Sequence, residues 1–321
     1  MSSGRQKVFM MVLGTSLANV ASAAVDLSNS TLLTYINGAE SMSYRIFLPD
    51  GYSPTGPKLP VVLYLHSAAE RGETADAIFS WIDNNTHQTV HNPWVTQLVN
   101  ETQHGAHKAI LITPETGAWQ YWNSINNGDS WAVGNYVNAT QPAINVNLQM
   151  AIDIVNQTLA NKQADANRVY VTGPSMGGYG TWDAMARFPN LLAAAVPLSG
   201  GGNTQAAGTI IKNKPVWAFH GVTDSLISVN NTDQLTTAIT AAGGHPVYSR
   251  VAGLGHEGWD TFYTPNTYKT GSPSVTGGTG QDMYSWMFAQ TTAVPEPTSI
   301  TLLLGFAAGA LLRRRQHTRS A

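Results

Sequence analysis

Residues 168–182 read RVYVTGPSMGGYGTW and place a serine between a strand pattern and a helix pattern. Residues 169–172 are β-branched or aromatic, as expected of a buried strand, and the residues after the serine have apolar positions at helical spacing. Between them, residues 173–177 match G-x-S-x-G. The two glycines leave room for a sharp turn that lifts the Ser175 hydroxyl out of the sheet. We therefore predict that Ser175 is a nucleophile; the alternative is an ordinary glycine-rich turn.

A nucleophilic serine needs a general base and a carboxylate that orients this base. Asp224 comes shortly after the strand pattern at 216–220, and His256 shortly after the strand pattern at 247–251. The order Ser, Asp, His is one of the known chain orders of such a triad. We predict that His256 accepts the proton of Ser175 and that Asp224 holds the imidazole. Alternatively, Asp224 is a turn residue and His256 a surface histidine.

A tetrahedral intermediate needs two backbone N–H groups to bind its oxyanion. The N–H of Met176, directly after the nucleophile, is predicted to be one of them. The loop after the strand pattern at 61–66 is predicted to supply the other, from Ala68 or, alternatively, from Ser67. Residues 70–71 are an adjacent Glu and Arg, which form either a solvated ion pair or a brace for this loop.

The rest of the body alternates strand and helix patterns. Continuous apolar or alternating runs predict strands at 44–48, 61–66, 109–113, 169–172, 193–198, 216–220 and 247–251. Helical spacing predicts helices at 94–100, at 141–161, directly after Ser175, and at 229–242. Such alternation predicts one α/β domain over residues 24–292, with a mostly parallel sheet covered by helices on both faces.

The first 23 residues have the layout of a secretory signal peptide. Arg5 and Lys7 precede an apolar run that begins at Val8, and Ala-Ser-Ala stands at 21–23. We predict cleavage after Ala23 and export of the protein. The alternative is an ordinary N-terminal helix.

The end of the chain, residues 293–321, is patterned as well. Val-Pro-Glu-Pro at 294–297 is followed by an apolar run at 300–312, which is short for a membrane span, and by three arginines at 313–315. This tail resembles the PEP-CTERM sorting signal of certain Gram-negative bacteria. The resemblance implies transient membrane contact, processing by an exosortase-type enzyme, and delivery to the cell surface or the exterior. The alternative is a tail helix packed on the domain.

Composition excludes several classes of function. The 321 residues carry a net charge of −2 with no block of like charge in the body, so we expect no nucleic-acid partner. The chain has no cysteine, which excludes disulfides, a thiolate nucleophile and cysteine metal sites. Four histidines lie near one another in sequence, but their spacing fits no metal motif, and no metal or other cofactor is predicted: His87, His91, His104 and His107.

Aromatic residues gather in the segment 117–136, at Trp119, Tyr121, Trp122, Trp131 and Tyr136. Such a loop beside the carboxyl edge of the sheet could hold an aromatic acyl group or a sugar ring. We predict that Trp122 contacts substrate, together with Trp259, which follows His256 by three positions. Alternatively, the aromatic residues pack the loop onto the domain.

Several stretches carry a resemblance to a known family. They are VVLYLHSAAERGE at 61–73, residues 168–202 around the nucleophile, PVWAFHGVTDSLISV at 215–229 and GLGHEGWD at 253–260. With them, residues 44–263 resemble the secreted esterase and predicted-peptidase group of the α/β-hydrolases, which includes feruloyl esterase-like, polyhydroxybutyrate depolymerase-like and dienelactone hydrolase-like proteins. The resemblance implies the α/β-hydrolase fold and the same three catalytic residues.

Two positions depart from the pattern of that family. The chain has His66-Ser67 where the family usually has His-Gly, which affects the shape of the oxyanion loop. Pro174 precedes the nucleophile and fixes its own φ angle. Neither departure removes a catalytic side chain.

The sequence thus favours a secreted serine hydrolase that cleaves carboxylic esters through an acyl-enzyme without a cofactor. Feruloyl, acetyl-sugar and polyester substrates all remain open. One alternative is a serine peptidase of prolyl-oligopeptidase type, although the chain has no room for the propeller domain usual in that group. The other is a catalytically silent surface protein that binds ligands through the aromatic loop.

Overall fold

The computed structural model describes residues 24–72, 74–82, 89–117, 120–123, 142–268, 275–278 and 280–293. The predicted signal peptide, residues 1–23, lies outside these ranges, as does the tail from residue 294. Among the described helices, none is both long enough and apolar enough to cross a membrane.

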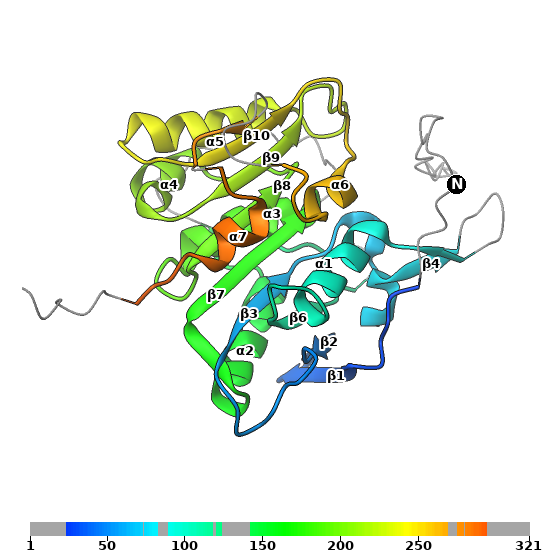
Figure 1. Cartoon of the computed structure of the whole chain (residues 1–321). Helices are drawn as coiled ribbons and strands as arrows, with labels where there is room; N and C mark the ends of the chain where they lie inside the picture. Colours follow the sequence, from blue (N-terminus) through cyan, green and yellow to red (C-terminus); the bar gives the residue numbers. More distant parts are fainter. Residues whose placement is uncertain are drawn as a thin grey trace, which may run out of the picture.

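A central sheet of nine strands, counted within the described residues, carries the domain (Figure 1). Its strands in chain order are β1 (Ser30–Asn37), β2 (Glu40–Phe47), β3 (Leu59–Tyr64), β6 (Ile110–Pro114), β7 (Ala164–Pro174), β8 (Ala194–Leu198), β9 (Trp217–Gly221), β10 (Val247–Val251) and β11 (Val275–Thr276). Their spatial order is β1-β2-β6-β3-β7-β8-β9-β10-β11. The six strands from β6 to β10 pair in parallel, while β1, β2 and β11 join antiparallel at the two sides. The predicted mostly parallel sheet is therefore confirmed.

Helices cover both faces of this sheet. They are α1 (Pro93–Gln103), α2 (Val146–Asn161), α3 (Met176–Arg187), α4 (Thr204–Thr209), α5 (Asn230–Ala241), α6 (Trp259–Tyr263) and α7 (Met283–Phe288). Within the described residues, two 3₁₀ turns precede α1, η1 (Ala68–Glu70) and η2 (Ala75–Ile78), and a third, η3 (Ile211–Asn213), lies between α4 and α5. A separate two-stranded hairpin pairs β4 (Ser80–Ile82) with β5 (Thr89–His91).

The alternation of side chains along the strands divides the core into two layers. Val61 and Leu63 of β3 pack into the layer beneath α2, α3, α4 and α5, whereas Val62 and Tyr64 pack into the layer beneath α1, α6 and α7. Figure 1 shows α1, α6 and α7 on the near side of the sheet. Because both faces are covered, β3, β6, β8 and β9 are apolar along almost their whole length.

Asparagine and aspartate side chains fix where several helices begin. Asn92 accepts a hydrogen bond from Val95 N at the start of α1, and Asn145 accepts one from Asn147 N at the start of α2. The second cap explains why this helix begins at Val146, a few residues after the predicted start at 141. The other predicted strands and helices lie within a few residues of their predicted positions.

Edge strand β1 was not predicted from the sequence. Leu32, Leu33 and Ile36 are exposed, and β1 pairs only with β2 among the described strands. Its run of adjacent apolar residues does not alternate as a half-buried strand should.

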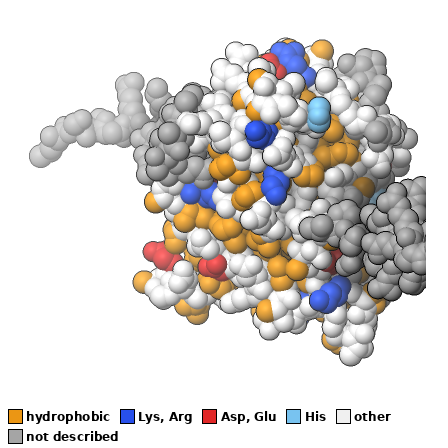
Figure 2. All heavy atoms as spheres, turned by 90° about the vertical axis from the view of Figure 1, so that its left-hand side faces the viewer, with side chains coloured by type: hydrophobic (Ala, Val, Ile, Leu, Met, Phe, Trp, Pro, Cys, Tyr) orange, Lys and Arg blue, Asp and Glu red, His pale blue; other side chains and the backbone are white. Residues whose placement is uncertain are grey.

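On the face shown in Figure 2, Lys and Arg side chains lie as separate spots between apolar and uncharged side chains.

Two isoleucines in strands give a matched test of this core. Ile112 in β6 is fully buried, whereas Ile36 in β1 is 71% exposed. We expect Ile112→Ala to lower the free energy of unfolding by about 2–5 kcal/mol, because it leaves a cavity in a close-packed layer. Ile36→Ala should change it by about 0.5 kcal/mol or less. Chemical denaturation of both variants measures the difference, and equal losses would contradict the assigned burial.

Candidate active site

Ser175 stands alone between the end of β7 at Pro174 and the start of α3 at Met176. Its backbone has φ 57° and ψ −115°, a conformation that costs energy for any residue with a side chain. The turn is held by the Ser175 amide, which donates to the Leu198 carbonyl of β8 at 2.9 Å. The strain therefore persists because the neighbouring strand fixes it, and the Ser175 side chain is displaced from the sheet at its carboxyl edge.

The two glycines of the turn are required by close backbone packing. A Cβ atom on Gly173 or on Gly177 would collide with the carbonyl oxygen of Leu65, the residue directly after β3. A Cβ on Gly177 would also come within 3.1 Å of the His66 carbonyl. The serine turn and the loop after β3 are therefore in direct backbone contact, as the G-x-S-x-G pattern predicts.

The structure brings Ser175, Asp224 and His256 together at this edge of the sheet. His256 Nε2 lies 3.0 Å from Ser175 Oγ, and His256 Nδ1 lies 2.6 Å from Asp224 Oδ2. Asp224 follows β9 and His256 follows β10, so neighbouring parallel strands deliver both side chains. The three residues span 81 positions of the chain, yet they form one continuous line of hydrogen bonds.

Asp224 is held as a carboxylate by several donors. Its Oδ1 accepts the backbone N–H groups of Leu226 at 2.9 Å and Ile227 at 2.8 Å. Its Oδ2, besides His256, lies 3.2 Å from Nε2 of the fully buried His220. Burial raises the pKa of Asp224, but the hydrogen bonds from His220 and His256 outweigh it and hold the pKa well below its usual range.

Trp259 forms the wall behind the imidazole of His256. The two rings meet edge to face with their centroids 4.9 Å apart, and the indole N–H donates to Ser199 Oγ at 3.1 Å. The side chain is nearly buried, with 4% of the residue exposed. Trp259 thus lies beside the predicted base, where it fixes the ring of His256, and its contact with substrate stays a proposal.

The prediction that Trp122 contacts substrate does not fit its position. The residue is fully buried, its indole N–H donates to the His66 carbonyl at 3.0 Å, and its ring packs edge to face on the His66 ring. Gly180 of α3 leaves the space that this side chain fills. Trp122 therefore packs against the loop after β3 and hydrogen-bonds to its backbone. Trp119, Trp131 and Tyr136 of the same aromatic segment lie outside the described residues.

The two predicted oxyanion donors lie on the two segments that meet here. Met176 begins α3 directly after Ser175, and Ala68 begins the 3₁₀ turn η1. Neither backbone N–H has a hydrogen-bond partner within the described part of the chain. The alternative donor, the Ser67 N–H, is already bound to Glu70 Oε2 at 2.5 Å. The geometry therefore favours Ala68 over Ser67.

Residues 70–71 do not form the solvated ion pair considered above, because Glu70 is only 1% exposed. Its carboxylate points inward, and burial raises its pKa to about 7, although the hydrogen bonds from Ser67, Tyr64 and Trp94 favour the charged form. Arg71 instead donates from Nε to the Ala68 carbonyl at 3.0 Å and lies over the ring of Tyr121. Both side chains thus contact the loop after β3.

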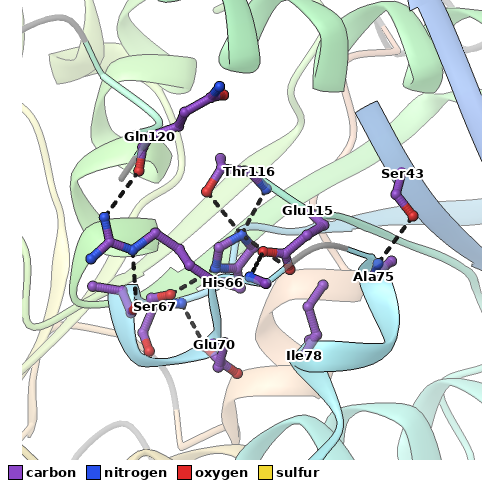
Figure 3. Close-up of polar contacts among 12 residues, drawn as sticks. Ser43, His66, Ser67, Glu70, Ala75, Ile78, Glu115, Thr116 and Gln120 are labelled. Atoms are coloured by element: carbon purple, nitrogen blue, oxygen red, sulfur yellow. Dashed lines mark hydrogen bonds and ion pairs between the residues drawn. The ribbon is translucent and has the colours of Figure 1, made fainter. Parts of the chain in front are cut away.

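A second buried acid lies on the other side of this loop (Figure 3). Glu115 follows β6, accepts the N–H of Gly72 at 2.6 Å, and places its Oε2 at 3.5 Å from His66 Nε2. Burial raises the pKa of Glu115 to about 9, and burial lowers the pKa of His66 to about 3. Both side chains are therefore uncharged at neutral pH. The His66 Nε2 accepts the N–H of Thr116 at 3.0 Å, so its Nδ1 carries the proton.

Sequence reasoning did not assign roles to His66, Glu115 and His220, and it left the role of Glu70 open. The only signal available is position, since His66, Glu115 and His220 stand at or just beyond the end of a parallel strand. Of the four histidines considered for a metal, His104 is paired with Asp50 and His107 with Glu101, whereas His87 lies outside the described residues. Across the described ranges, no three His, Asp or Glu side chains are grouped as metal ligands.

Two family models match parts of this chain. The dienelactone hydrolase family matches residues 127–257, a stretch that contains Ser175, Asp224 and His256, and the PEP-CTERM protein-sorting motif matches residues 293–316. The predicted resemblance to α/β-hydrolase esterases with a sorting tail is thereby confirmed.

Three individual proteins illustrate the similarity. A bifunctional acetylxylan esterase/xylanase of Neocallimastix patriciarum is 32% identical over 85 residues, which cover 26% of this chain and 12% of that protein. The crystal structure of a thermostable esterase is 25% identical with a TM-score of 0.62, over 83% of this chain and 64% of the other. The feruloyl esterase module of Clostridium thermocellum, complexed with sinapinate, is 15% identical with a TM-score of 0.52, over 73% of this chain and 85% of the other. The fold is that of the α/β-hydrolases.

The raised pKa of Glu115 predicts a pH-dependent stability. A carboxyl group whose pKa is about 9 in the folded protein stabilises the fold fully below its unfolded pKa, near 4.5, and loses this contribution as the pH rises through 9. Glu70, with a pKa of about 7, contributes little further change above that pH. Glu115→Gln keeps the acceptor for Gly72 and cannot ionise. Between pH 7 and 9 it should therefore gain about 1–3 kcal/mol relative to the wild type.

Urea denaturation at pH 7, 8 and 9 measures this difference in the free energy of unfolding. Glu40→Gln, on an exposed glutamate of β2, is the matched control and should follow the wild type at each pH. Parallel curves for the wild type and Glu115→Gln would show that Glu115 ionises normally.

Proposed function

We propose that this α/β-hydrolase, which matches the dienelactone hydrolase family over its candidate active site, is a serine hydrolase that cleaves carboxylic esters through an acyl-enzyme. The observation that carries the proposal is the line of hydrogen bonds from Ser175 through His256 to Asp224, with lengths of 3.0 Å and 2.6 Å. The esterases among its relatives support an ester rather than another carbonyl substrate.

The first half of the reaction forms the acyl-enzyme. Ser175 Oγ attacks the ester carbonyl carbon while His256 Nε2 takes the hydroxyl proton. The negative charge on the former carbonyl oxygen is bound by the N–H groups of Met176 and Ala68. When the tetrahedral intermediate collapses, the C–O bond to the alcohol breaks, and the alcohol leaves with the proton from His256.

The second half returns the enzyme to its resting state. Water attacks the acyl carbon, His256 accepts a proton from this water, and the acid leaves as Ser175 regains its hydrogen. Asp224 keeps the Nδ1 proton of His256 in place throughout, so that Nε2 presents its lone pair to Ser175. Because the Asp224 pKa is well below its usual range, the carboxylate stabilises the imidazolium without taking up its proton.

Feruloyl, acetyl-sugar and polyester substrates are the proposed classes. Feruloyl and acetylxylan esterases are named among the similar proteins, which favours esters attached to plant polysaccharides. A serine peptidase activity and a catalytically silent binding role are the alternatives. The aromatic segment 117–136, which was predicted to hold an aromatic acyl group or a sugar ring, lies largely outside the described residues.

The two ends of the chain support a proposed location. The signal-peptide pattern at 1–23 would direct export, and the sorting motif at 293–316 would bring the protein to exosortase-type processing machinery at the membrane. The catalytic domain, residues 24–292, would then act at the surface or outside a Gram-negative cell.

Turnover of a short p-nitrophenyl ester tests the proposal. We expect the wild type to release p-nitrophenol and Ser175→Ala to lose about 10⁴-fold or more of kcat, because no other group can form the acyl-enzyme. Asp224→Asn should lose a similar factor, since it favours the wrong tautomer of His256. Ser53→Ala, on a loop distant in sequence from all three residues, is the control for serine removal.

Feruloylated sugars, acetylated xylan, polyesters and peptide amides, compared by kcat/KM, would rank the substrate classes. Hydrolysis of peptide amides in preference to every ester would favour the peptidase alternative. A folded wild type without activity on the entire panel would contradict the proposed function and favour the silent binding role.

A further inference from the structure

The Glu70 carboxylate is buried among four hydrogen-bond donors. Oε2 accepts the Ser67 N–H at 2.5 Å, and Oε1 accepts the Tyr64 hydroxyl at 3.0 Å, the Trp94 indole N–H at 3.1 Å, and the Asn92 side-chain amide. A carboxylate accepts hydrogen bonds and donates none, so it matches this set of donors. The donors come from the end of β3, the loop after it and the start of α1. Glu70 therefore joins three separate segments at one point.

The peptide group between His66 and Ser67 is locked at both ends. Its carbonyl accepts the Trp122 indole N–H at 3.0 Å. Its N–H donates to Glu70, as Figure 3 shows. A peptide group is planar, so fixing the oxygen and the hydrogen fixes the whole unit. Glu70 supplies one of these two contacts.

The next peptide group, between Ser67 and Ala68, is held at its carbonyl. This oxygen accepts the His66 Nδ1–H at 2.7 Å, and the Glu70 backbone N–H lies 3.3 Å from it. The Ala68 carbonyl accepts Arg71 Nε at 3.0 Å. Of the backbone groups of residues 67–68, the Ala68 N–H is the one left without a partner in the described structure. The direction of the Ala68 N–H is set by the Ser67 carbonyl, which lies on the opposite side of the same planar peptide group.

A second series of contacts leads from Glu70 to the predicted base. The Trp94 indole that donates to Glu70 meets Trp259 edge to face, with ring centroids 5.2 Å apart. Trp259 in turn meets the His256 ring edge to face at 4.9 Å. One buried carboxylate is thus linked by packing and hydrogen bonds to both the oxyanion loop and the imidazole.

We propose that Glu70 is a positioning residue of the active site: by binding the Ser67 N–H it commits that group and leaves the Ala68 N–H aimed at the oxyanion. The inference rests on the proposed ester hydrolysis, in which this N–H binds the tetrahedral intermediate. Glu70 contacts no reacting atom. Its effect is on the transition state, because an oxyanion donor acts where negative charge develops and not on the neutral ester.

Glu70→Gln tests the inference because it keeps the shape and removes one acceptor. Three donors lie closest to Oε1 and only the Ser67 N–H lies closest to Oε2, so the single amide oxygen satisfies most donors at the Oε1 position. The N–H₂ group then faces the Ser67 N–H, which is no longer held. We expect kcat on p-nitrophenyl acetate to fall about 10- to 100-fold, up to the loss seen when an oxyanion donor is removed, with KM within about twofold. The inhibition constant of phenylboronic acid, which adds the serine oxygen to give a tetrahedral boronate, should rise by a similar factor.

Glu101→Gln is the matched control. Glu101 is a largely buried glutamate of α1 that binds His107 and does not touch the loop, so kcat and boronate affinity should stay at wild-type values. If Glu70→Gln does not fold, Tyr64→Phe removes a single hydroxyl from the same carboxylate. We expect this variant to lose about 3- to 10-fold of kcat at unchanged KM.

The outcomes separate the inference from the proposed function. A folded Glu70→Gln, or Tyr64→Phe in its place, with wild-type kcat and boronate affinity would overturn the inference alone. So would a variant in which KM rises and kcat is unchanged, since that is a loss of ground-state binding. A wild type that leaves every ester intact, as Ser175→Ala does, would overturn the proposed function and this inference together.

Discussion

The packing of the serine turn against the loop after β3 is the constraint on which the site depends. Gly173 and Gly177 let the turn backbone lie directly on the Leu65 carbonyl, and no residue with a Cβ could do so. The contact holds Ser175 at φ 57° and at the same time brings the next N–H, that of Met176, beside the loop that carries Ala68. The proposed nucleophile and the two proposed oxyanion donors are thus placed by one approach of two backbone segments. The conformational energy that the strained Ser175 backbone costs is offset by its contacts with the neighbouring strands.

Polar side chains around this contact are buried but matched to one another. Burial of a charged group is costly unless hydrogen bonds replace its water. Four donors favour the charged form of Glu70, although burial still raises its pKa to about 7. Glu115 and His66 meet the requirement by remaining uncharged at neutral pH. Asp224 keeps its charge because two imidazoles and two backbone N–H groups surround it. The polar network is therefore concentrated at the carboxyl ends of the strands, where it fixes the loops, and the layers beneath the sheet stay apolar.

The sequence predicts the fold and the meeting of Ser175, Asp224 and His256 because each of these residues follows a recognisable strand. Parallel strands deliver their carboxyl ends to one edge, so chain position alone implies proximity. The direction of a side chain carries no such local signal. From the sequence, Trp122 could face a pocket or the core; the structure shows that it is fully buried and bound to the His66 carbonyl. The role of Glu70 depends on donors from three segments, and edge strand β1 lacks the alternation by which strands are recognised.

The central claim is that Ser175 is the nucleophile and that the hydrogen bonds to His256 and Asp224 activate it. Covalent labelling by a fluorophosphonate, which transfers its phosphonyl group to an activated serine with loss of fluoride, tests this most directly. Peptide mapping by mass spectrometry should find the label on Ser175 alone, and labelling should be at least about 10³-fold slower in His256→Ala. A label on another serine, or an ester-hydrolysing protein whose Ser175 stays unmodified, would contradict the account.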